Sequence, residues 1–409
     1  MGIAGAALGA VATTVAVDRL TATRSVRREA LAALDAAGPY GTLRGTPGTA
    51  TAEDGTELYY EIDEVGGGPA DGAYDRPADD GAGGPVTEPL APRLPPPAVP
   101  APRTPGAPGR LARLLRPASG TARRPPPTVV FCHGYCLSQD VWHFQRAALR
   151  GAVRAVYWDQ RGHGRSASGR LPEPVGIPLL ARDLKAVLDA AVPEGPVVLV
   201  GHSMGGMTVM ALAEQYPDYV ASRVAGIALL GTSAGRMAEV GYGLPPSAAR
   251  ALRKLLPGVV RALGSRQGLV DAGRRAAGEL YGGVVRRYAF GRPEQVDPGV
   301  ARFAERLLES VPMDVVAGFY PAFGEHDTTG ALPVLAGLAH DLPVLVLAGG
   351  KDLVTPPEHS ERIAEVLPGA EHTVLPDAGH LLLLEAPREV NDRLGALLAR
   401  SIPFHEPAV

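Results

Sequence analysis

The sequence predicts an α/β fold in which a mostly parallel, doubly wound sheet is covered by helices on both faces. From residue 128 onward, short and nearly continuous apolar runs alternate with helical patterns, as expected for strands buried on both sides. Polar clusters follow these runs directly, at the carboxyl ends of the strands, where open α/β sheets bind ligands. One run, residues 197–200, passes through Gly-His-Ser-Met-Gly into a helical pattern. The sequence therefore predicts a site at this edge of the sheet.

The turn after residues 197–200 matches the Gly-x-Ser-x-Gly nucleophile elbow, which places a serine between a strand and a helix. Gly201 and Gly205 leave room for the close passage of backbone that so sharp a turn requires, with His202 and Met204 flanking the serine. The following helix would direct its free N–H groups toward an oxyanion beside Ser203. Ordinary glycine–serine turns share this short pattern, so the rest of the chain decides its meaning.

Composition excludes several classes of function. The 409 residues carry a formal net charge of −3, which provides no basic field for a nucleic-acid partner. The two cysteines, Cys132 and Cys136, are too few for a disulfide framework and make a poor metal site by themselves. We therefore expect no nucleic-acid partner and no metal.

The first 44 residues combine an apolar run with an arginine-rich helical pattern. Residues 2–17 are apolar and uncharged, but this run is shorter than the roughly 20 residues that span a bilayer. Three interpretations stay open: a membrane-associating anchor, a loose helix, and a signal peptide, which would normally carry positive charge before the run. If the run spans a membrane, the arginines behind it hold the main body in the cytoplasm. We expect a cytoplasmic protein, with membrane association through residues 2–17 as an open alternative.

A hairpin and a long insertion precede the main alternating segment. Residues 45–65 contain two β-like runs around an Asp-Gly pair, which supplies the positive φ angles of a tight turn. Residues 66–127 are rich in proline, glycine, alanine and aspartate, and cannot bury enough apolar surface to offset their ordering entropy. We expect a disordered, solvated insertion. A peptide ligand for an aromatic groove is the alternative for its proline-rich part.

The core elements after the insertion follow from the apolar periodicity. Strands are expected at residues 129–132, 152–158, 197–200, 224–230, 343–348 and 371–375. Helices are expected at residues 137–149, 182–192, 358–367 and 388–400. The core is thus expected in two parts, residues 45–65 with 128–233, and residues 341–409.

Residues 234–340 separate the two parts of the core and break the alternation of strands and helices. Helical patterns occupy this segment at residues 248–263, 274–288 and 300–308. Because the segment leaves and returns at the carboxyl edge of the sheet, we expect a helical cap over the site, inserted before the strand that bears the acid. The alternative is that these helices lie on the protein surface away from the site.

A base and an acid for Ser203 stand at the ends of the last two strands. A serine becomes nucleophilic when an imidazole removes its proton, and a carboxylate orients that imidazole. On this type of sheet the order along the chain is serine, acid, histidine. Asp352 and His380 follow consecutive strands in that order and reach the edge that carries Ser203. Asp377 is the alternative acid, although it lies close to His380 in sequence.

An oxyanion hole needs two N–H donors near the serine. We expect the backbone N–H of Met204 and that of Tyr135, in the loop after the strand at residues 129–132. His133 and His163 stand beside glycines in tight loops, so loop-fixing hydrogen bonds are favoured over a role as extra bases. Cys136 is interpreted as structural, since Ser203 already supplies the nucleophile.

Taken together, these motifs resemble the α/β-hydrolase superfamily, and more narrowly its esterase, lipase and non-haem haloperoxidase-like branch. The motifs are His133-Gly134, residues 159–166 (Asp-Gln-Arg-Gly-His-Gly-Arg-Ser), residues 201–206 (Gly-His-Ser-Met-Gly-Gly), Asp352 and Gly379-His380. The resemblance covers residues 45–64 and 128–402. It implies an eight-stranded, mostly parallel sheet with a helical cap, a triad of Ser203, Asp352 and His380, and no cofactor. A serine at the elbow also speaks against dehalogenase or epoxide hydrolase chemistry, for which the related families use aspartate.

The resulting hypothesis is a serine hydrolase that cleaves a carboxylic ester of a small or medium apolar substrate through an acyl-enzyme. The predicted apolar faces of the cap favour such a small-molecule substrate. The same residues would support perhydrolysis, or cleavage of a thioester, amide or C–C bond. A slow-turnover ligand receptor is a rival from another class, because a fold does not determine a function. Membrane-tethered lipid hydrolysis is a third reading, and the oligomeric state is left open.

Overall fold

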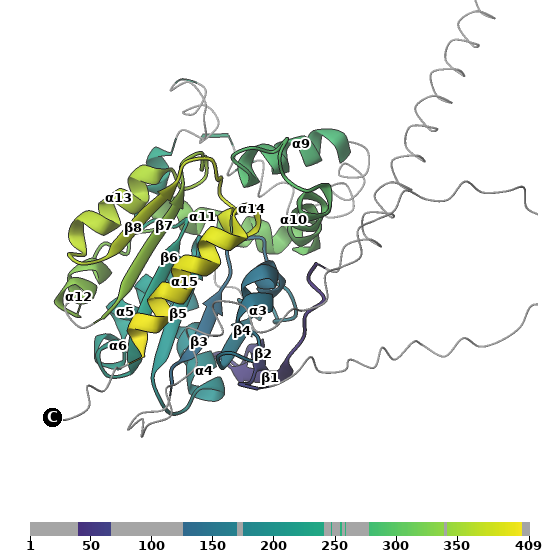
Figure 1. Ribbon diagram of the computed structural model, residues 1–409. Helices are drawn as coiled ribbons and strands as arrows, with labels where there is room; N and C mark the ends of the chain where they lie inside the picture. Colours follow the sequence, from purple (N-terminus) through teal and green to yellow (C-terminus); the bar gives the residue numbers. More distant parts are fainter. Residues whose placement is uncertain are drawn as a thin grey trace, which may run out of the picture.

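The computed structural model describes residues 40–66, 126–169, 175–240, 278–338 and 342–402, together with residues 247, 254–255 and 258. Its centre is an eight-stranded sheet (Figure 1). In their order across the sheet, the strands are β1 (Thr46–Thr51), β2 (Glu57–Asp63), β4 (Ala155–Trp158), β3 (Thr128–Cys132), β5 (Val197–His202), β6 (Val224–Leu230), β7 (Val344–Gly349) and β8 (Glu371–Leu375). The two pairings of β2 are antiparallel and all others are parallel. The mostly parallel α/β sheet is therefore confirmed.

The central strands are buried on both faces, which explains their continuous apolar runs. Every residue of β3, β4, β5 and β7 is buried. Alternate residues of β5 enter two separate hydrophobic clusters: Val197 and Leu199 one, Val198 and Val200 the other. A strand with polar residues at alternate positions would leave one of these clusters incomplete.

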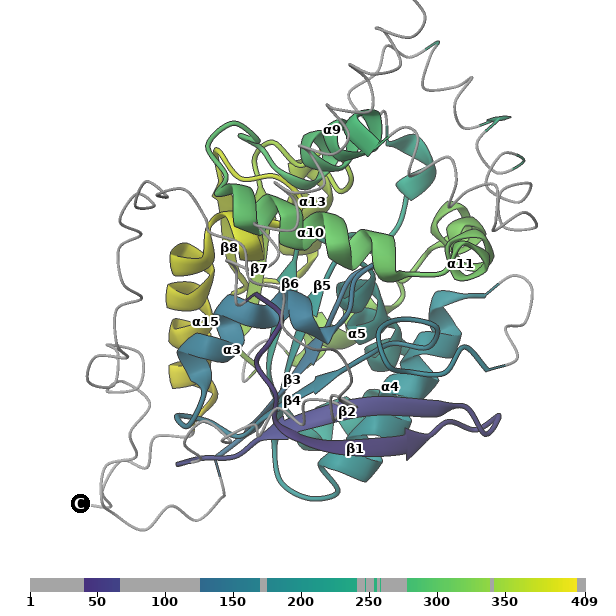
Figure 2. The same cartoon turned by 90° about the vertical axis from the view of Figure 1, so that its right-hand side faces the viewer.

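Helices cover both faces of the sheet (Figure 2). On one side, α3 (His143–Leu149), α14 (Leu382–Glu385) and α15 (Pro387–Ser401) contribute to the cluster that contains Val198. On the other side lie α4 (Ile177–Ala191), α5 (Met204–Gln215), α6 (Pro217–Arg223), α12 (Ala331–Leu338) and α13 (Pro357–Val366). The arrangement confirms a doubly wound sheet.

The strand order reverses beside β3, which pairs with β4 on one side and with β5 on the other. Such a reversal opens a crevice at the carboxyl ends of the two strands, because the connections leave in opposite directions. The loop that begins at His133 follows β3, and the turn at Ser203 follows β5. The topology therefore brings these two segments together.

Three helices lie over the carboxyl ends of the strands: α9 (Gly278–Ala289), α10 (Pro298–Ser310) and α11 (Met313–Glu325) (Figures 1 and 2). α9 and α10 correspond to the helical patterns at residues 274–288 and 300–308. The sequence pattern missed α11 and α12. α12 contacts α5 and α13 on a face of the sheet, so part of the segment before β7 belongs to the helical layer.

Most core elements occur where the sequence predicts them, with shifts at their ends. β4 begins at Ala155 and not at residue 152, because residues 151–153 form a turn in which Gly151 has φ = 74°. α4 begins at Ile177, well before residue 182, since an extended Gly176 precedes it and a proline occupies its first turn. The helix expected at residues 137–149 is divided into the 3₁₀ helix η1 (Gln139–Trp142) and α3.

Several expectations concern residues outside the described part of the chain. They are the apolar run at residues 2–17, nearly all of the insertion at residues 66–127 and most of the helical pattern at residues 248–263. Within the described ranges, no helix is both long and apolar enough to cross a bilayer. The anchor at residues 2–17 stays a prediction.

Candidate active site

Ser203 stands in the turn between β5 and α5, in a backbone conformation that residues with a side chain rarely adopt. Its φ and ψ are 53° and −119°. A Cβ on Gly201 would lie 2.6 Å from the Cα of Gly206, and one on Gly205 would collide with the carbonyl of Cys132. Both glycines are therefore required by close backbone approaches, and the turn holds the serine at the carboxyl edge of the sheet.

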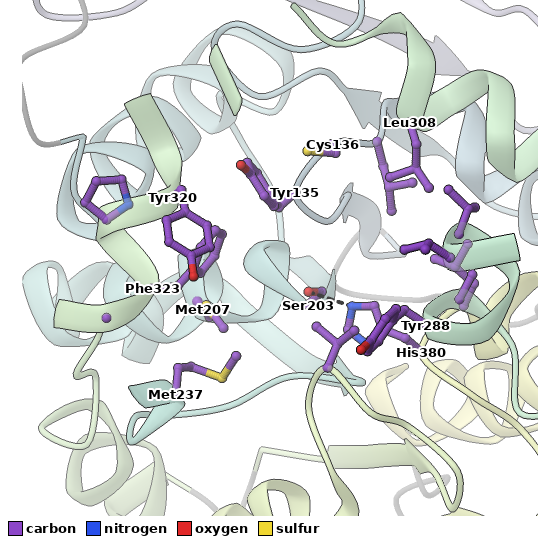
Figure 3. Close-up of a pocket in the computed structure, with 18 of the residues that line it drawn as sticks. Tyr135, Cys136, Ser203, Met207, Met237, Tyr288, Leu308, Tyr320, Phe323 and His380 are labelled. Carbon is purple, nitrogen blue, oxygen red and sulfur yellow. Dashed lines mark hydrogen bonds between the residues drawn. The ribbon is translucent and has the colours of Figure 1, made fainter. Parts of the chain in front are cut away.

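Ser203, His380 and Asp352 form one hydrogen-bonded chain. His380 Nε2 lies 3.0 Å from Ser203 Oγ (Figure 3). His380 Nδ1 lies 2.8 Å from Asp352 Oδ2. Ser203 and Asp352 are buried, and the His380 side chain is only 12% exposed. Because a carboxylate only accepts hydrogen bonds, Nδ1 carries the proton and Nε2 is free to accept one from the serine.

The carboxylate of Asp352 is itself held by the turn that follows β7. Oδ1 accepts the N–H groups of Val354 and Thr355 at 2.7 and 2.8 Å, and Oδ2 accepts the Thr355 hydroxyl at 2.9 Å. Sequence reasoning missed Thr355. Its signal was a threonine three residues after the aspartate in a short turn, where such side chains commonly bond to each other and to the backbone.

His202 holds the backbone of His380. Its Nε2 lies 2.9 Å from the His380 carbonyl oxygen, which only accepts, so Nε2 carries the proton. Burial, aided by the neighbouring imidazole of His380, lowers the pKa of His202 to about 3. The imidazole of His202 therefore remains neutral and keeps this hydrogen bond in one tautomer.

Two backbone N–H groups are available for an oxyanion beside Ser203. Within the part of the chain that the structure describes, the N–H groups of Met204 and Tyr135 donate to no acceptor. Cys136, directly after Tyr135, has φ = 58°, a strained value for a residue with a side chain. The Tyr135 hydroxyl donates to the carbonyl of Val316 in α11 at 2.6 Å, which ties this loop to the cap.

The loop of Tyr135 is braced by two neutral histidines, as the sequence suggested. His133 Nδ1 bonds to the Gly134 carbonyl at 2.8 Å, and its Nε2 accepts the Gln160 N–H at 2.9 Å. His163 Nε2 accepts the Cys136 N–H at 3.2 Å, and its Nδ1 bonds to the Arg161 carbonyl. Burial lowers the pKa of His133 to about 4 and that of His163 to about 3. Both rings therefore stay neutral, and their hydrogen bonds fix the backbone of this loop.

Ser203 and His380 line a cavity of about 630 Å³. Figure 3 shows Ser203 in the middle, with Tyr320, Phe323, Met207 and Met237 on one side and Tyr288 and Leu308 on the other. The described residues of the lining are Tyr135, Cys136, Leu137, Ser203, Met207, Met237, Val284, Val285, Tyr288, Ala289, Leu308, Tyr320, Pro321, Phe323, Gly324, Glu325, Val354, His380 and Leu381. Among the described residues of this lining, Glu325 is the one carboxylate, and none is a lysine or an arginine.

Asp377, the alternative acid, lies outside the hydrogen-bonded chain of Ser203, His380 and Asp352. Asp377 forms ion pairs with Arg292 and Lys351 on the surface, and it makes no hydrogen bond to His380. Burial raises the pKa of the Cys132 thiol to about 12, so this thiol stays protonated and unreactive. Cys136 lies in the cavity wall. Within the described ranges, no three His, Cys, Asp or Glu side chains cluster as metal ligands would.

The site combines a strand–serine–helix elbow with a hydrogen-bonded histidine and carboxylate and with two free N–H groups. These are the groups that proteins of the class that attacks substrates with a serine require. The model of the alpha/beta hydrolase fold family matches residues 127–387. The chain belongs to this family and is an α/β-hydrolase enzyme.

Curated relatives have different reactions. A dihydrolipoyllysine-residue acetyltransferase component of an acetoin cleaving system from Pseudomonas putida is 29% identical over 74% of this chain and 70% of its own length. The sn-1-specific diacylglycerol lipase ABHD11 of Mus musculus is 28% identical over 67% of this chain and 81% of its own. Epoxide hydrolase A of Mycobacterium tuberculosis is 30% identical over 66% of this chain and 89% of its own.

Solved structures share the fold at lower identity. A thermophilic esterase from Thermogutta terrifontis has a TM-score of 0.57 and 22% identity, covering 87% of this chain and 99% of that one. A bromoperoxidase from Bacillus anthracis has a TM-score of 0.55 and 17% identity, covering 86% of this chain and 99% of that one. The expected resemblance to esterases and haloperoxidase-like hydrolases is confirmed at the level of the fold.

Proposed function

We propose that this chain is a serine hydrolase that cleaves carboxylic esters of small or medium apolar substrates through an acyl-enzyme. The observation that carries the proposal is the hydrogen-bonded chain Ser203–His380–Asp352 at the edge of an apolar cavity. An imidazole in this tautomer accepts the serine proton, and a carboxylate on its other nitrogen stabilises the imidazolium that results. These residues therefore have the arrangement that acyl transfer requires.

In the proposed reaction, Ser203 Oγ attacks the ester carbonyl carbon while His380 Nε2 takes the serine proton. The oxyanion that forms receives hydrogen bonds from the N–H groups of Met204 and Tyr135. His380 returns the proton to the departing alkoxide, which leaves as the alcohol, and the acyl group stays on Ser203. Water then attacks the acyl-enzyme with His380 as base, which releases the acid and restores the serine.

The lining of the cavity supports an apolar, uncharged substrate. The cavity volume of about 630 Å³ lies within the range of sites for small organic ligands. Aliphatic and aromatic side chains dominate the wall, and the flexible side chains of Met207 and Met237 can adapt to groups of different shape. Among the described lining residues, an anionic substrate would meet Glu325 and no cationic side chain, so a carboxylate near the reacting ester is disfavoured.

A lipid ester is the second candidate. The relative ABHD11 is named a diacylglycerol lipase, and its similarity spans two thirds of this chain. Val284, in the cavity lining, is 49% exposed, which leaves an apolar side chain of α9 at the boundary between cavity and solvent. A diacylglycerol presented in mixed micelles would then be cleaved faster than a short soluble ester.

The direct test is the hydrolysis of chromogenic esters from acetyl to palmitoyl by the wild type and by Ser203→Ala. We expect turnover by the wild type, a preferred chain length that reflects the cavity, and a loss of about three or more decades in the variant. An isosteric control, Ser222→Ala, removes a surface hydroxyl in α6 and is expected to change nothing. If the wild type is inert on every ester, ester hydrolysis is not the activity, and the thioester, amide, perhydrolase and receptor readings take its place.

A further inference from the structure

The loop that bears His380 is bound to the end of the cap helix α9 by one carboxylate. Glu385 Oε2 accepts the N–H of Gly379, directly before His380, at 2.7 Å. The same carboxylate accepts the N–H of Gly291 at 2.9 Å and that of Arg292 at 2.9 Å, just after α9. A single side chain thus joins backbone groups on both sides of the boundary between cap and core.

The cap and this loop also touch without any side chain between them. The N–H of Leu381, directly after His380, donates to the carbonyl of Ala289 at 2.7 Å. A Cβ on Gly291 would lie 2.8 Å from the N of Gly379, which is closer than real Cβ atoms approach. The His380 loop is therefore tied to the cap on both sides of the histidine, in direct backbone contact.

The helix that ends in this contact is also a wall of the cavity. Val284, Val285, Tyr288 and Ala289 of α9 belong to the same lining as Ser203 and His380. Any ligand chain that packs against this wall contacts the helix whose end is bonded to the histidine loop. A shift of α9 would be carried to Gly379 and Leu381, because charge-assisted and backbone hydrogen bonds at this contact are short and directional.

We propose that Glu385 is a positioning residue that couples the cap wall formed by α9 to the alignment of His380 with Ser203. The inference rests on the proposed serine hydrolase function. Occupation of the α9 wall by the apolar chain of a substrate sets the position of His380 through Glu385, while His202 holds the carbonyl of His380 by a separate hydrogen bond. A longer chain therefore raises the rate of the chemical step, besides tightening binding.

The test uses alkyl p-nitrophenyl phosphonates of increasing chain length, because their reaction requires the nucleophile and the base but no ester turnover. Ser203 Oγ forms a bond to phosphorus, p-nitrophenolate leaves, and the serine proton passes to His380. The limiting rate constant of labelling and the half-saturating concentration are measured separately for each chain. Mass spectrometry of the labelled peptide identifies Ser203 as the modified residue.

In the wild type, we expect the limiting rate constant to rise as the chain becomes long enough to reach α9. In Glu385→Ala, we expect a rate constant about 10- to 100-fold lower, as for small misplacements of catalytic groups. The dependence of this rate constant on chain length should weaken strongly, because the backbone bond from Leu381 to Ala289 remains as a link to α9 but the bonds of Glu385 are lost. The half-saturating concentration should keep its dependence. Glu385→Gln retains one acceptor oxygen and the side-chain shape, so its rate constant should lie between those of the wild type and Glu385→Ala. This variant also tests the proposal if the alanine variant does not fold.

Asp377→Asn is the matched control. Asp377 is a carboxylate of the same loop and pairs with Arg292, but through exposed side chains that contribute little. Its rate constants should stay within about twofold of the wild type. If the Glu385 variants lose thermal stability but keep the wild-type rate constant and its chain-length dependence, the positioning role is overturned while the hydrolase stands. If Ser203 of the wild type is not labelled by any chain, the proposed function fails, and the coupling fails with it.

Discussion

The imidazole of His202 donates its Nε2–H to the backbone carbonyl of His380 at 2.9 Å. The residue directly before the proposed nucleophile therefore anchors the backbone of its proposed base. Since His202 belongs to the elbow between β5 and α5, the same turn that presents Ser203 also fixes the distance to its base. This relationship makes a specific prediction for a residue outside the triad.

We expect His202→Ala to lower kcat about 10- to 100-fold with little change in KM, because His380 loses its anchor while the cavity keeps its lining. The buried carbonyl left without a donor should also lower the free energy of unfolding by about 1–3 kcal/mol. His202→Gln, whose amide can donate to the same carbonyl, should recover part of both losses. Steady-state kinetics and urea unfolding of the two variants check this; equal kcat in wild type and alanine variant would contradict it.

The acid of the triad can be identified by two matched substitutions. Asp352→Asn should lower kcat by about 10⁴-fold, because an amide no longer stabilises the imidazolium and favours the wrong tautomer of His380. Asp377→Asn should leave kcat nearly unchanged, since Asp377 pairs with Arg292 and Lys351. Ester kinetics at saturating substrate distinguish the two. Comparable losses in both variants would reopen the assignment of the acid.

Thr355 should prove to be a supporting residue of the carboxylate. Thr355→Val removes the hydroxyl that donates to Asp352 Oδ2 at 2.9 Å and keeps the shape of the side chain. A hydrogen bond to a charged group contributes about 1.5–3 kcal/mol, so we expect a lower kcat and a measurable loss of stability. Thr355→Ser, which retains the hydroxyl, is the control and should behave like the wild type in both assays.

The buried histidines predict a loss of stability in mild acid. Burial lowers the pKa of His163 to about 3, whereas an unfolded histidine titrates near a pKa of about 6.5. Between these values the unfolded chain binds the additional proton, so the free energy of unfolding falls as pH decreases below about 6.5. The stability that this group contributes is present above its unfolded pKa and diminishes progressively down to its folded pKa.

Urea unfolding of the wild type and of His163→Asn between pH 7 and pH 5 measures this contribution. Because the variant lacks one of the titrating groups, its slope of stability against pH should be smaller by up to about 1.4 kcal/mol per pH unit. The pKa of His163 in the folded protein, followed by NMR, provides an independent check. Parallel curves for the two proteins would show that His163 is not held neutral by the fold.

The alternating pattern of apolar runs and helices predicted most of the described core because its cause is local. A strand buried on both faces, such as β5, is apolar over most of its length, here at all four residues 197–200, and this is visible in the sequence. The elbow could also be recognised from a local pattern, because Gly201 and Gly205 stand where side chains cannot fit. Helices α11 and α12 were missed because most of their positions are apolar, the buried and the less buried ones alike, so no simple periodicity marks one face.

The sequence by itself determined the fold class, the candidate nucleophile and the order of its candidate partners, since each depends on a short pattern beside a predicted strand. Only the tertiary structure decided which groups meet. His202 at the His380 carbonyl, and Glu385 between the cap and the histidine loop, join residues of different elements. Such contacts depend on how strands and helices pack in space, and no local periodicity records them.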